Sequence, residues 1–418
     1  MGFVKEKILR WLRWSEQYTK TDMVYLAKGS GLLGFGQLVS ASAGFITALV
    51  FANFLPKETY GVYKFILSMA ALLSVTTLSG IGVAVTRAVA RGFDGAMDEA
   101  MRTKFRWGLL GSVASAALTG YYYMQGNTVL ALSFFVVALF LPAMEAFGVY
   151  DSFLQGKKEF GVSLKYSIAS KILSIIALVV TVLLTDNVFL LLLAYFVPFT
   201  LTRFVFLRHV RHLYKTNDTK EPGMTTFGNH LSIMGILGVV ANQLDKLLVF
   251  NFLGATELAA YAIISAPVDQ VKALVDNVSK IALPKFSQQS ESAIRGTIWR
   301  RMFLLLIGLV TLSLLYWIAV PFLFPIFFPQ YVEYAFLSQL FGLSIISFAL
   351  FIPLQILQSK QETKRLYVLN TFASVMQIIL SAIAVVLYGL VGVVLARVIA
   401  RLLNVSIFLI ALRSTLQK

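Results

Sequence analysis

Cysteine is absent from the 418 residues, which excludes disulfides, thiolate metal sites and cysteine nucleophiles. No P-loop sequence is present, so the chain has no ATP-hydrolysing site of the P-loop type. A literal G-x-G-x-x-G runs from Gly29 to Gly34, but it lacks the acidic residue about 20 positions further on that dinucleotide binding requires. His209 and His212 lie in a basic stretch without neighbouring carboxylates and make a poor metal site. We therefore expect no cofactor, no bound metal and no enzymatic activity.

Charged residues are also scarce, at 13% of the chain, whereas hydrophobic residues reach 58% and the mean hydropathy is +0.78. This balance is far more apolar than that of soluble proteins. A transmembrane helix needs about 20 apolar residues, so the chain has room for roughly twelve. The sequence predicts an all-α polytopic membrane protein of about 12 transmembrane helices. The expected spans are 28–54, 61–90, 104–124, 128–155, 162–185, 187–208, 225–253, 257–285, 300–324, 331–357, 366–388 and 390–412.

Basic residues dominate the charge, with 36 Lys and Arg against 20 Asp and Glu. Placing both termini and every second turn on the cytoplasmic side collects 28 basic residues there and leaves Lys57 and Lys64 on the opposite side. Because cytoplasmic loops carry the excess of Lys and Arg, we expect both termini to be cytoplasmic in the cell (inner) membrane. Residues 1–27 place apolar residues at helical spacing between basic ones, as in an amphipathic segment on the cytoplasmic membrane surface. The net charge of +16 thus indicates membrane topology and contact with anionic lipids, not nucleic-acid binding.

A polar stretch at 209–224 divides the expected spans six and six. Its charge, proline and glycine are typical of a linker. It separates an N-terminal half, 28–208, from a C-terminal half, 225–418. The outer loops, such as 124–128, are short and leave no extracytoplasmic domain for a soluble active site.

Internal repetition supports this division. Asn-Phe-Leu followed eight residues later by Tyr occurs at 53–63 and again at 251–261. Leu-Gln-x-Lys-x-Glu occurs at 154–159 and again at 357–362, in the turn between the fourth and fifth spans of each half. Because each half has an even number of spans, both halves keep the same orientation, as in several transporter folds.

Eleven ionisable residues lie inside the expected spans, where each costs about 2.5 to 3.5 kcal/mol at a helix centre. Such residues must face the protein interior or a wet cavity, and by default they indicate a substrate or ion pathway. The bases are Lys171, Arg203, Lys246, Lys272, Arg397 and Arg401, and the acids are Glu145, Asp151, Asp245, Asp269 and Asp276.

One polar stripe follows the eighth span. Asp269, Lys272, Asp276 and Lys280 recur at i, i+3, i+7 and i+11 and lie on one helix face. This face cannot contact lipid. It either lines a pathway or forms ion pairs with neighbouring helices.

Two further groups of charges are informative. Arg397 and Arg401 lie one turn apart with no acid of their own helix nearby, so an anionic ligand or acids of neighbouring helices must balance them. Asp245 and Lys246 diverge by about 100° on the seventh span, so at least one of them points at another helix. For Asp245, a proton or sodium site and a buried structural pair both stay open.

Several segments of the chain together follow the pattern of a known family. They are Lys28-Gly29-Ser30, Ala52 to Tyr63, Leu244 to Val249, Phe252-Leu253-Gly254, Tyr261 and the two Leu-Gln-x-Lys turns. In these segments the chain resembles polysaccharide repeat-unit (O-antigen type) flippases of the multidrug/oligosaccharidyl-lipid/polysaccharide (MOP) exporter superfamily. The resemblance implies two six-helix lobes around a central cavity that opens alternately to each side of the membrane. It also implies a polyprenyl-diphosphate-linked oligosaccharide as cargo, moved from the cytoplasmic to the outer leaflet.

A cationic cavity suits the diphosphate of such a cargo. On charge alone, the candidates for substrate binding are Arg397, Arg401, Lys246, Lys272 and Arg87, and the candidates for coupling transport to H+ or Na+ are Asp245, Asp269 and Asp276. Membrane lipids and other polysaccharide-assembly proteins are the further partners we expect.

Three alternatives stay open. An ion-coupled multidrug or metabolite exporter of the same superfamily would hold a cationic substrate with carboxylates, above all Asp269 and Asp276. A membrane glycosyltransferase or polymerase would also handle polyprenyl-linked sugars, but it commonly needs a sizeable extramembrane loop for its catalytic residues. A purely structural membrane protein would not need eleven ionisable residues within its spans.

Overall fold

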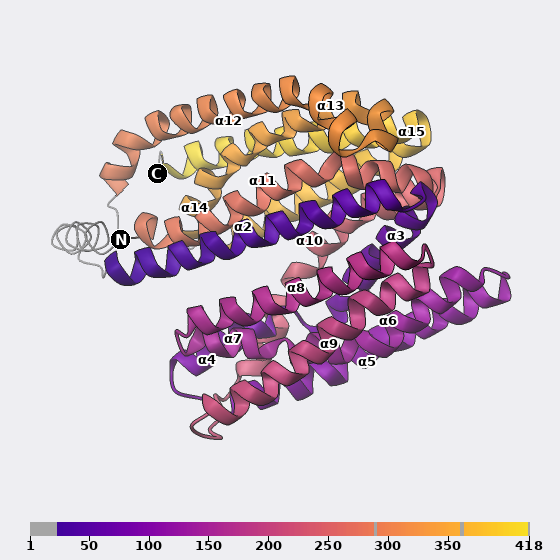
Figure 1. Ribbon diagram of the computed structural model, residues 1–418. Helices are drawn as coiled ribbons and strands as arrows, with labels where there is room; N and C mark the ends of the chain where they lie inside the picture. Colours follow the sequence, from indigo (N-terminus) through magenta and orange to yellow (C-terminus); the bar gives the residue numbers. More distant parts are fainter. Residues whose placement is uncertain (1–22, 288–290, 360–362, 417–418) are drawn as a thin grey trace, which may run out of the picture.

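The computed structural model describes residues 23–287, 291–359 and 363–416, and this part of the chain is helical with no strand. Figure 1 shows two groups of long helices, one made mainly of the first half of the chain and one mainly of the second half. The groups diverge toward the side where the chain ends lie and approach each other at the opposite side.

The first half begins with a long helix and ends with another. Its elements are α2 (Met23–Phe54), α3 (Lys57–Leu73), η1 (Ser74–Thr77), α4 (Ile81–Ala90), α5 (Ala96–Met124), α6 (Thr128–Phe147), α7 (Val149–Gly156), α8 (Phe160–Leu184) and α9 (Val188–Leu213). Because α9 continues to Leu213, the connection between the halves is shorter than the expected linker and comprises 214–223.

The second half repeats the pattern of long helices. Its elements are α10 (Met224–Leu253), α11 (Ala255–Ser287), α12 (Glu291–Phe327), η2 (Pro329–Tyr334), α13 (Ala335–Gly342), η3 (Leu343–Leu350), α14 (Phe351–Ser359) and α15 (Thr363–Leu416). Helix α15 contains both of the last two expected spans, which are separated by a non-helical residue, Gly389, with φ of 56°.

Nine helical stretches of the described chain are long and apolar enough to cross a membrane. One of them, Arg365–Ser414, is 50 residues long and contains the break at Gly389, so it corresponds to two expected spans. Helices α2 and α5 coincide with the remaining two. All twelve expected spans therefore correspond to helical segments of the structure.

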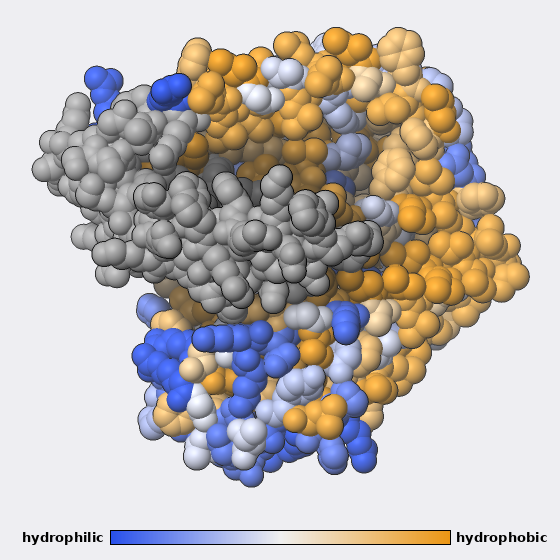
Figure 2. Space-filling view, turned by 60° about the vertical axis from the view of Figure 1, so that its left-hand side comes forward, coloured by the Kyte–Doolittle hydropathy of each residue, from blue (hydrophilic) through white to orange (hydrophobic). Residues whose placement is uncertain are grey.

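The surface agrees with a membrane location. Figure 2 shows hydrophilic residues gathered at one end of the molecule, where α4 ends, α5 begins and α9 leads into the connection, beside broad apolar surfaces. Large apolar side chains stay exposed along the expected spans, as lipid-facing residues do. Examples are Phe135, Leu139, Ile176, Val180, Ile233, Leu314, Ile318 and Val386.

We use two names for the ends of the molecule. The basic end contains the turns at 91–95, 157–159 and 214–223, and the far end contains the turns at 55–56 and 125–127. The connection between the halves is fastened to the first half at the basic end, because its residues bind the α4–α5 turn.

Asp94 is the centre of this fastening. Its side chain is fully buried, and its carboxylate accepts hydrogen bonds from Lys157 Nζ at 2.7 Å and from the Thr216 backbone at 2.8 Å. Burial raises the pKa of Asp94, but the hydrogen bonds from Lys157 and Thr216 outweigh burial and leave the pKa below its usual range.

The two halves meet most closely at the far end, where the repeated segments pack against each other. A Cβ on Gly61 of α3 would overlap the carbonyl oxygen of Ala255 at the start of α11, so this crossing requires glycine. The rings of Phe65 and Phe250 stack with their centroids 3.7 Å apart. One hydrophobic cluster therefore runs through both halves and closes the far end.

Candidate functional site

A central cavity of about 430 Å³ lies between helices of both halves, on the inner side of the closed far end. It is bordered by α2, α3, α8, α9, α10 and α11. Its polar and aromatic lining residues include Ser40, Thr47, Tyr63, Lys64, Lys171, Ser174, Tyr195, Phe199, Lys246, Ser265, Asp269 and Gln270. The cavity thus lies where a cargo would contact both halves.

Positive charge dominates the wall of this cavity. Lys64, Lys171 and Lys246 line it from three different helices, whereas Asp269 is the one carboxylate among the lining residues that the structure describes. Lys171 Nζ donates to Ser40 at 2.5 Å, and Lys246 Nζ lies 3.3 Å from the Gln243 amide oxygen. Both of these hydrogen-bond partners are neutral side chains.

Lys64 corrects one detail of the sequence-based topology. The count of basic residues places it on the outer side, but it lies two turns inside α3 and lines the central cavity. The signal was present in the sequence, because Lys64 falls inside the expected span 61–90. It therefore belongs with Lys171 and Lys246 among the charges within spans.

Aromatic rings form another part of the wall. Tyr195 and Phe199 of α9 stack with their centroids 5.6 Å apart, and both line the cavity. Behind them, the Arg203 guanidinium lies 4.7 Å from the centre of the Phe199 ring. Arg203 also lies 3.5 Å from Glu145, which lies 3.8 Å from Lys104. These span charges pair with one another and do not line the cavity.

Asp245 and Arg397 form a second charged group, deep in the second half. Arg397 Nη1 lies 3.4 Å from Asp245 Oδ2, and Tyr261 Oη donates to the same oxygen at 2.5 Å. Asp245 therefore points away from the cavity, whereas its neighbour Lys246 lines it. The two side chains diverge as the sequence predicted.

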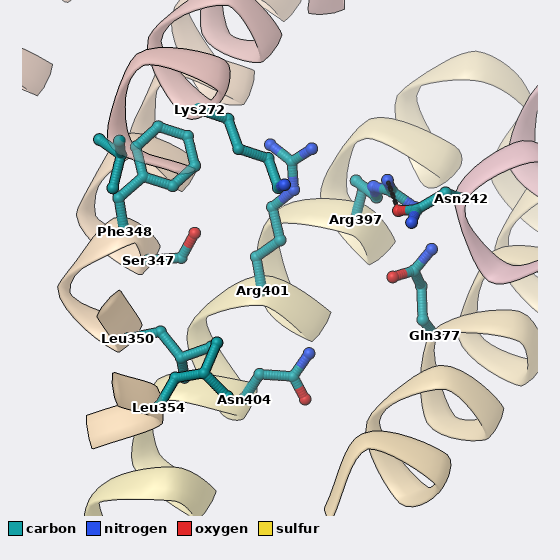
Figure 3. A pocket seen from close by; sticks show the side chains of 11 residues that line it. Asn242, Lys272, Ser347, Phe348, Leu350, Leu354, Gln377, Arg397, Arg401 and Asn404 are labelled. Carbon is teal, nitrogen blue, oxygen red and sulfur yellow. Dashed lines mark hydrogen bonds between the residues drawn. The ribbon is translucent and has the colours of Figure 1, made fainter. Parts of the chain in front are cut away.

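The ion pair of Asp269 and Arg401 lies between the central cavity and a second, smaller one. Arg401 Nη2 donates to Asp269 Oδ1 at 3.0 Å, and the Asp269 side chain keeps 44% of its surface exposed. Asp269 lines the central cavity, while Arg401 lines a smaller cavity of about 200 Å³ together with Arg397 and Lys272. Figure 3 shows these cationic groups around the smaller cavity.

The structure thus separates the predicted site residues. Lys246 and Asp269 line the central cavity, and Lys272, Arg397 and Arg401 line the smaller one. Arg87 lies at the end of α4, stacks on Phe227 and pairs with Glu221 at the basic end. The side chain of Asp276 lies outside the described residues. Charge alone did not single out Lys64 and Lys171 as substrate ligands, and the structure places them beside Lys246.

No group of three or more His, Asp or Glu residues that could hold a metal ion occurs in the described part of the chain.

Comparison with known proteins gives the family. The sequence pattern of the family described as "polysaccharide biosynthesis protein" matches residues 26–289. A comparison with curated proteins gave no match.

Solved structures with the same fold are membrane transporters. The MATE multidrug transporter DinF-BH superposes with a TM-score of 0.67 at 13% identity and covers 93% of this chain and 95% of its own. An inward-facing MATE transporter of the MOP superfamily gives 0.62 at 12% identity, covering 89% and 98%. A MOP superfamily transporter from Pyrococcus furiosus, described as having a binding pocket of reversed polarity, gives 0.60 at 14% identity, covering 94% and 96%.

These similarities confirm the expected fold of twelve helices in two lobes. The family pattern covers more than half of the chain, so the chain belongs to the polysaccharide biosynthesis protein family, with the fold of MOP-superfamily membrane transporters.

Proposed function

We propose that this protein moves a polyprenyl-diphosphate-linked oligosaccharide from the cytoplasmic to the outer leaflet by alternating access. The observation that carries the proposal is the charge of the central cavity, where three lysines face one carboxylate. That carboxylate, Asp269, is itself paired with Arg401. An anionic group is therefore favoured in the cavity and a cation is disfavoured.

The diphosphate fits the lysines. Lysine ammonium groups bind phosphate as point charges. The three lysines of the cavity wall lie on different helices, Lys64 on α3, Lys171 on α8 and Lys246 on α10. Ligands from both halves suit alternating access, because a cargo held by both lobes can bias their relative position. We assign the diphosphate to these three lysines, and the glycan to the aromatic and hydroxyl-bearing wall beside them.

The direction of transport follows from the proposed topology. Placing the basic end in the cytoplasm follows the positive-inside rule, and both termini are then cytoplasmic in the cell membrane. The closed far end faces outward in that orientation, so the cavity of this conformation would accept cargo from the cytoplasmic side.

Coupling to H+ or Na+ is part of the proposal. Asp269 is the best-placed carboxylate, because it lines the cargo cavity and is partly exposed. Asp245 is buried and already held by Arg397 and Tyr261, so an ion could reach it only if Arg397 moved. Contacts with other polysaccharide-assembly proteins remain an expectation of the family.

An ion-coupled exporter of organic cations is the second candidate. The multidrug transporters that share the fold favour it, and Asp269 supplies a carboxylate in the cavity. Two observations oppose it: the three lysines of the cavity wall and the pairing of Asp269 with Arg401.

The test is transbilayer movement of a polyprenyl-diphosphate-linked oligosaccharide in liposomes that contain the purified protein, measured by accessibility of the sugar to an external probe. Lys64→Gln, Lys171→Gln and Lys246→Gln should each slow movement by about tenfold, the effect of losing about 1.4 kcal/mol of interaction. Lys165→Gln is the matched control, because Lys165 is an exposed lysine on the same helix as Lys171.

Unchanged movement in the triple variant, shown to be inserted and folded, would contradict the assignment of the diphosphate to these lysines. If the wild-type protein moved organic cations but no lipid-linked sugar, the exporter interpretation would replace the proposal.

A further inference from the structure

A second polar cavity lies inside the C-terminal half, separate from the central cavity. Two adjoining spaces of about 200 Å³ and 670 Å³ share Asn242, Lys272, Gln377 and Asn404. They lie between α10, α11, η3, α14 and the two parts of α15. We call them together the C-half cavity. The ion pair of Asp269 and Arg401 lies between this cavity and the central one.

The smaller part of the C-half cavity is lined by hydrogen-bond donors. Arg397, Arg401 and Lys272 provide positive charge, and Asn242, Gln377 and Asn404 provide amides. No carboxylate occurs among the lining residues that the structure describes. Figure 3 shows the nitrogen-bearing ends of Lys272 and Arg401 directed into the same space, with Arg397, Asn242 and Gln377 beside it.

One hydrogen-bond donor of Arg397, its Nε, has no acceptor. Its Nη1 faces Asp245 and the Ala241 carbonyl, and its Nη2 lies 3.3 Å from the Asn242 amide oxygen. Its Nε has no hydrogen-bond partner, although the residue is only 7% exposed. A buried donor of a charged group without an acceptor is costly, so a missing acceptor is expected here.

Asn404 is the second residue with an unsatisfied atom in this cavity. The side-chain oxygen that its amide presents is buried and has no partner. Because the two ends of an amide are interchangeable by rotation, the same side chain can present its NH2 group at that position. Arg397 and Asn404 therefore line the same small space, and each has a buried atom there without a hydrogen-bond partner.

We propose that the C-half cavity binds a small inorganic anion of the size of chloride, held by Arg397 Nε, Arg401, Lys272 and the Asn404 amide. The anion lies in the smaller part of this cavity, which is lined by Arg397 and Arg401 and whose volume of about 200 Å³ is far too small for an oligosaccharide. The Asp269–Arg401 pair separates this part from the cavity assigned to the cargo. The anion is a second ligand, so its site stands independently of the proposed function.

The experiment uses the purified full chain in detergent without any lipid-linked sugar. Thermal unfolding is recorded in sodium chloride, sodium bromide and sodium gluconate at constant ionic strength. Because a ligand stabilises the state that binds it, chloride and bromide should raise the Tm saturably by about 2–4 °C, whereas gluconate should not. Bromide should also give an anomalous-scattering peak beside Arg397 Nε in crystals.

Variants locate the site. Arg397→Gln/Asp245→Asn keeps the buried pair neutral and should abolish the halide-dependent rise in Tm. Asn404→Leu should weaken it at least about threefold in apparent affinity, a partial loss expected from one neutral hydrogen bond. Arg203→Gln/Glu145→Gln is the matched control, because it neutralises a paired arginine and acid of the other half, and it should retain the full rise.

A rise of equal size in gluconate, or one retained in the folded Arg397→Gln/Asp245→Asn variant, would overturn the proposal. If that variant fails to fold, Asn404→Leu and the bromide peak in the wild-type protein decide. Water instead of bromide at Arg397 Nε, under conditions where halide binding should be saturated, would equally overturn it.

Discussion

Arg397 and Asp245 form an ion pair across the second half, with Arg397 Nη1 3.4 Å from Asp245 Oδ2 and side chains only 8% and 2% exposed. The pair connects the last part of α15 to the middle of α10, and Tyr261 of α11 donates to the same carboxylate. Three helices are therefore joined at one buried oxygen. Removing a single partner would leave an uncompensated charge in the protein interior.

Arg397→Gln should lower the free energy of unfolding by about 3–5 kcal/mol, the usual effect of breaking a buried ion pair. The double variant Arg397→Gln/Asp245→Asn should recover most of this loss, because two neutral amides can hydrogen-bond to each other. Denaturant unfolding of the purified protein in detergent measures both. A single variant as stable as the wild type would show that Asp245 has another compensating partner.

Transport by alternating access requires the two halves to separate at the far end. Lys57 Nζ lies 2.8 Å from Glu333 Oε1, and this exposed pair joins the halves with the small energy typical of surface ion pairs, about 0–1 kcal/mol. Cross-linking Lys57→Cys to Glu333→Cys with a bifunctional thiol reagent should reduce lipid-linked sugar movement by at least about tenfold, because one lobe could no longer move against the other. Reduction of a cleavable linker should restore movement.

Because the chain has no natural cysteine, the thiol reagent can react only with the two introduced residues. Each single-cysteine variant treated with the same reagent is the control and should keep its activity. Full transport by the cross-linked pair would mean that the far end does not open in the cycle.

Asp94 should make stability depend on pH. Its folded-state pKa lies below the ordinary value near 3.9, so its contribution is present above about pH 4 and is lost as the pH falls through the folded-state pKa. Asp94→Asn should lower the free energy of unfolding at pH 7 by about 1.5–3 kcal/mol, the range for hydrogen bonds to charged groups.

The difference between Asp94→Asn and the wild type should shrink as the pH falls from about 4 through the lower folded-state pKa of Asp94, because protonation removes the charge that Lys157 and Thr216 stabilise. All other carboxylates are common to the two proteins, so their titration cancels in the comparison. A difference that stays constant down to about pH 2.5 would show that Asp94 does not contribute through its charge.

The proposed topology makes a prediction about labelling in intact cells. Gln125→Cys at the far end should react with a membrane-impermeant maleimide, whereas Lys220→Cys at the basic end should react only after permeabilisation. Both positions are exposed, and the wild-type chain gives no background because it has no cysteine. The reverse labelling pattern would place the basic end outside and reverse the proposed direction of transport.

Much of the fold could be predicted from the order of residues. A helix that crosses the hydrocarbon core needs about 20 consecutive apolar residues, so the twelve spans could be read from local composition. The Asn-Phe-Leu and Tyr repeat marked equivalent segments of the two halves. In the structure its copies span the α2–α3 and α10–α11 junctions, and they meet where Gly61 of α3 packs on Ala255 of α11. Boundaries were less predictable, since α9 continues to Leu213 into the expected linker.

The candidate site, like the fold, was only partly predictable from the sequence. Local sequence required every span charge to avoid lipid, because the cost of an exposed charge in hydrocarbon depends only on its position along a span. It also required Asp245 and Lys246 to point in different directions, since helix geometry fixes the angle between neighbours. It could not say which helix each of them faces.

Which charges meet each other was decided by the tertiary structure. Arg397 meets Asp245, Arg401 meets Asp269, and Lys64 shares a cavity with Lys171 and Lys246 only because helices distant in sequence are brought together. The sequence determined that these charges must be inside. Their partition into a cargo cavity and a separate C-half cavity was decided by how the two halves pack, because the rotation and neighbours of a helix depend on packing across the whole molecule and not on its own residues.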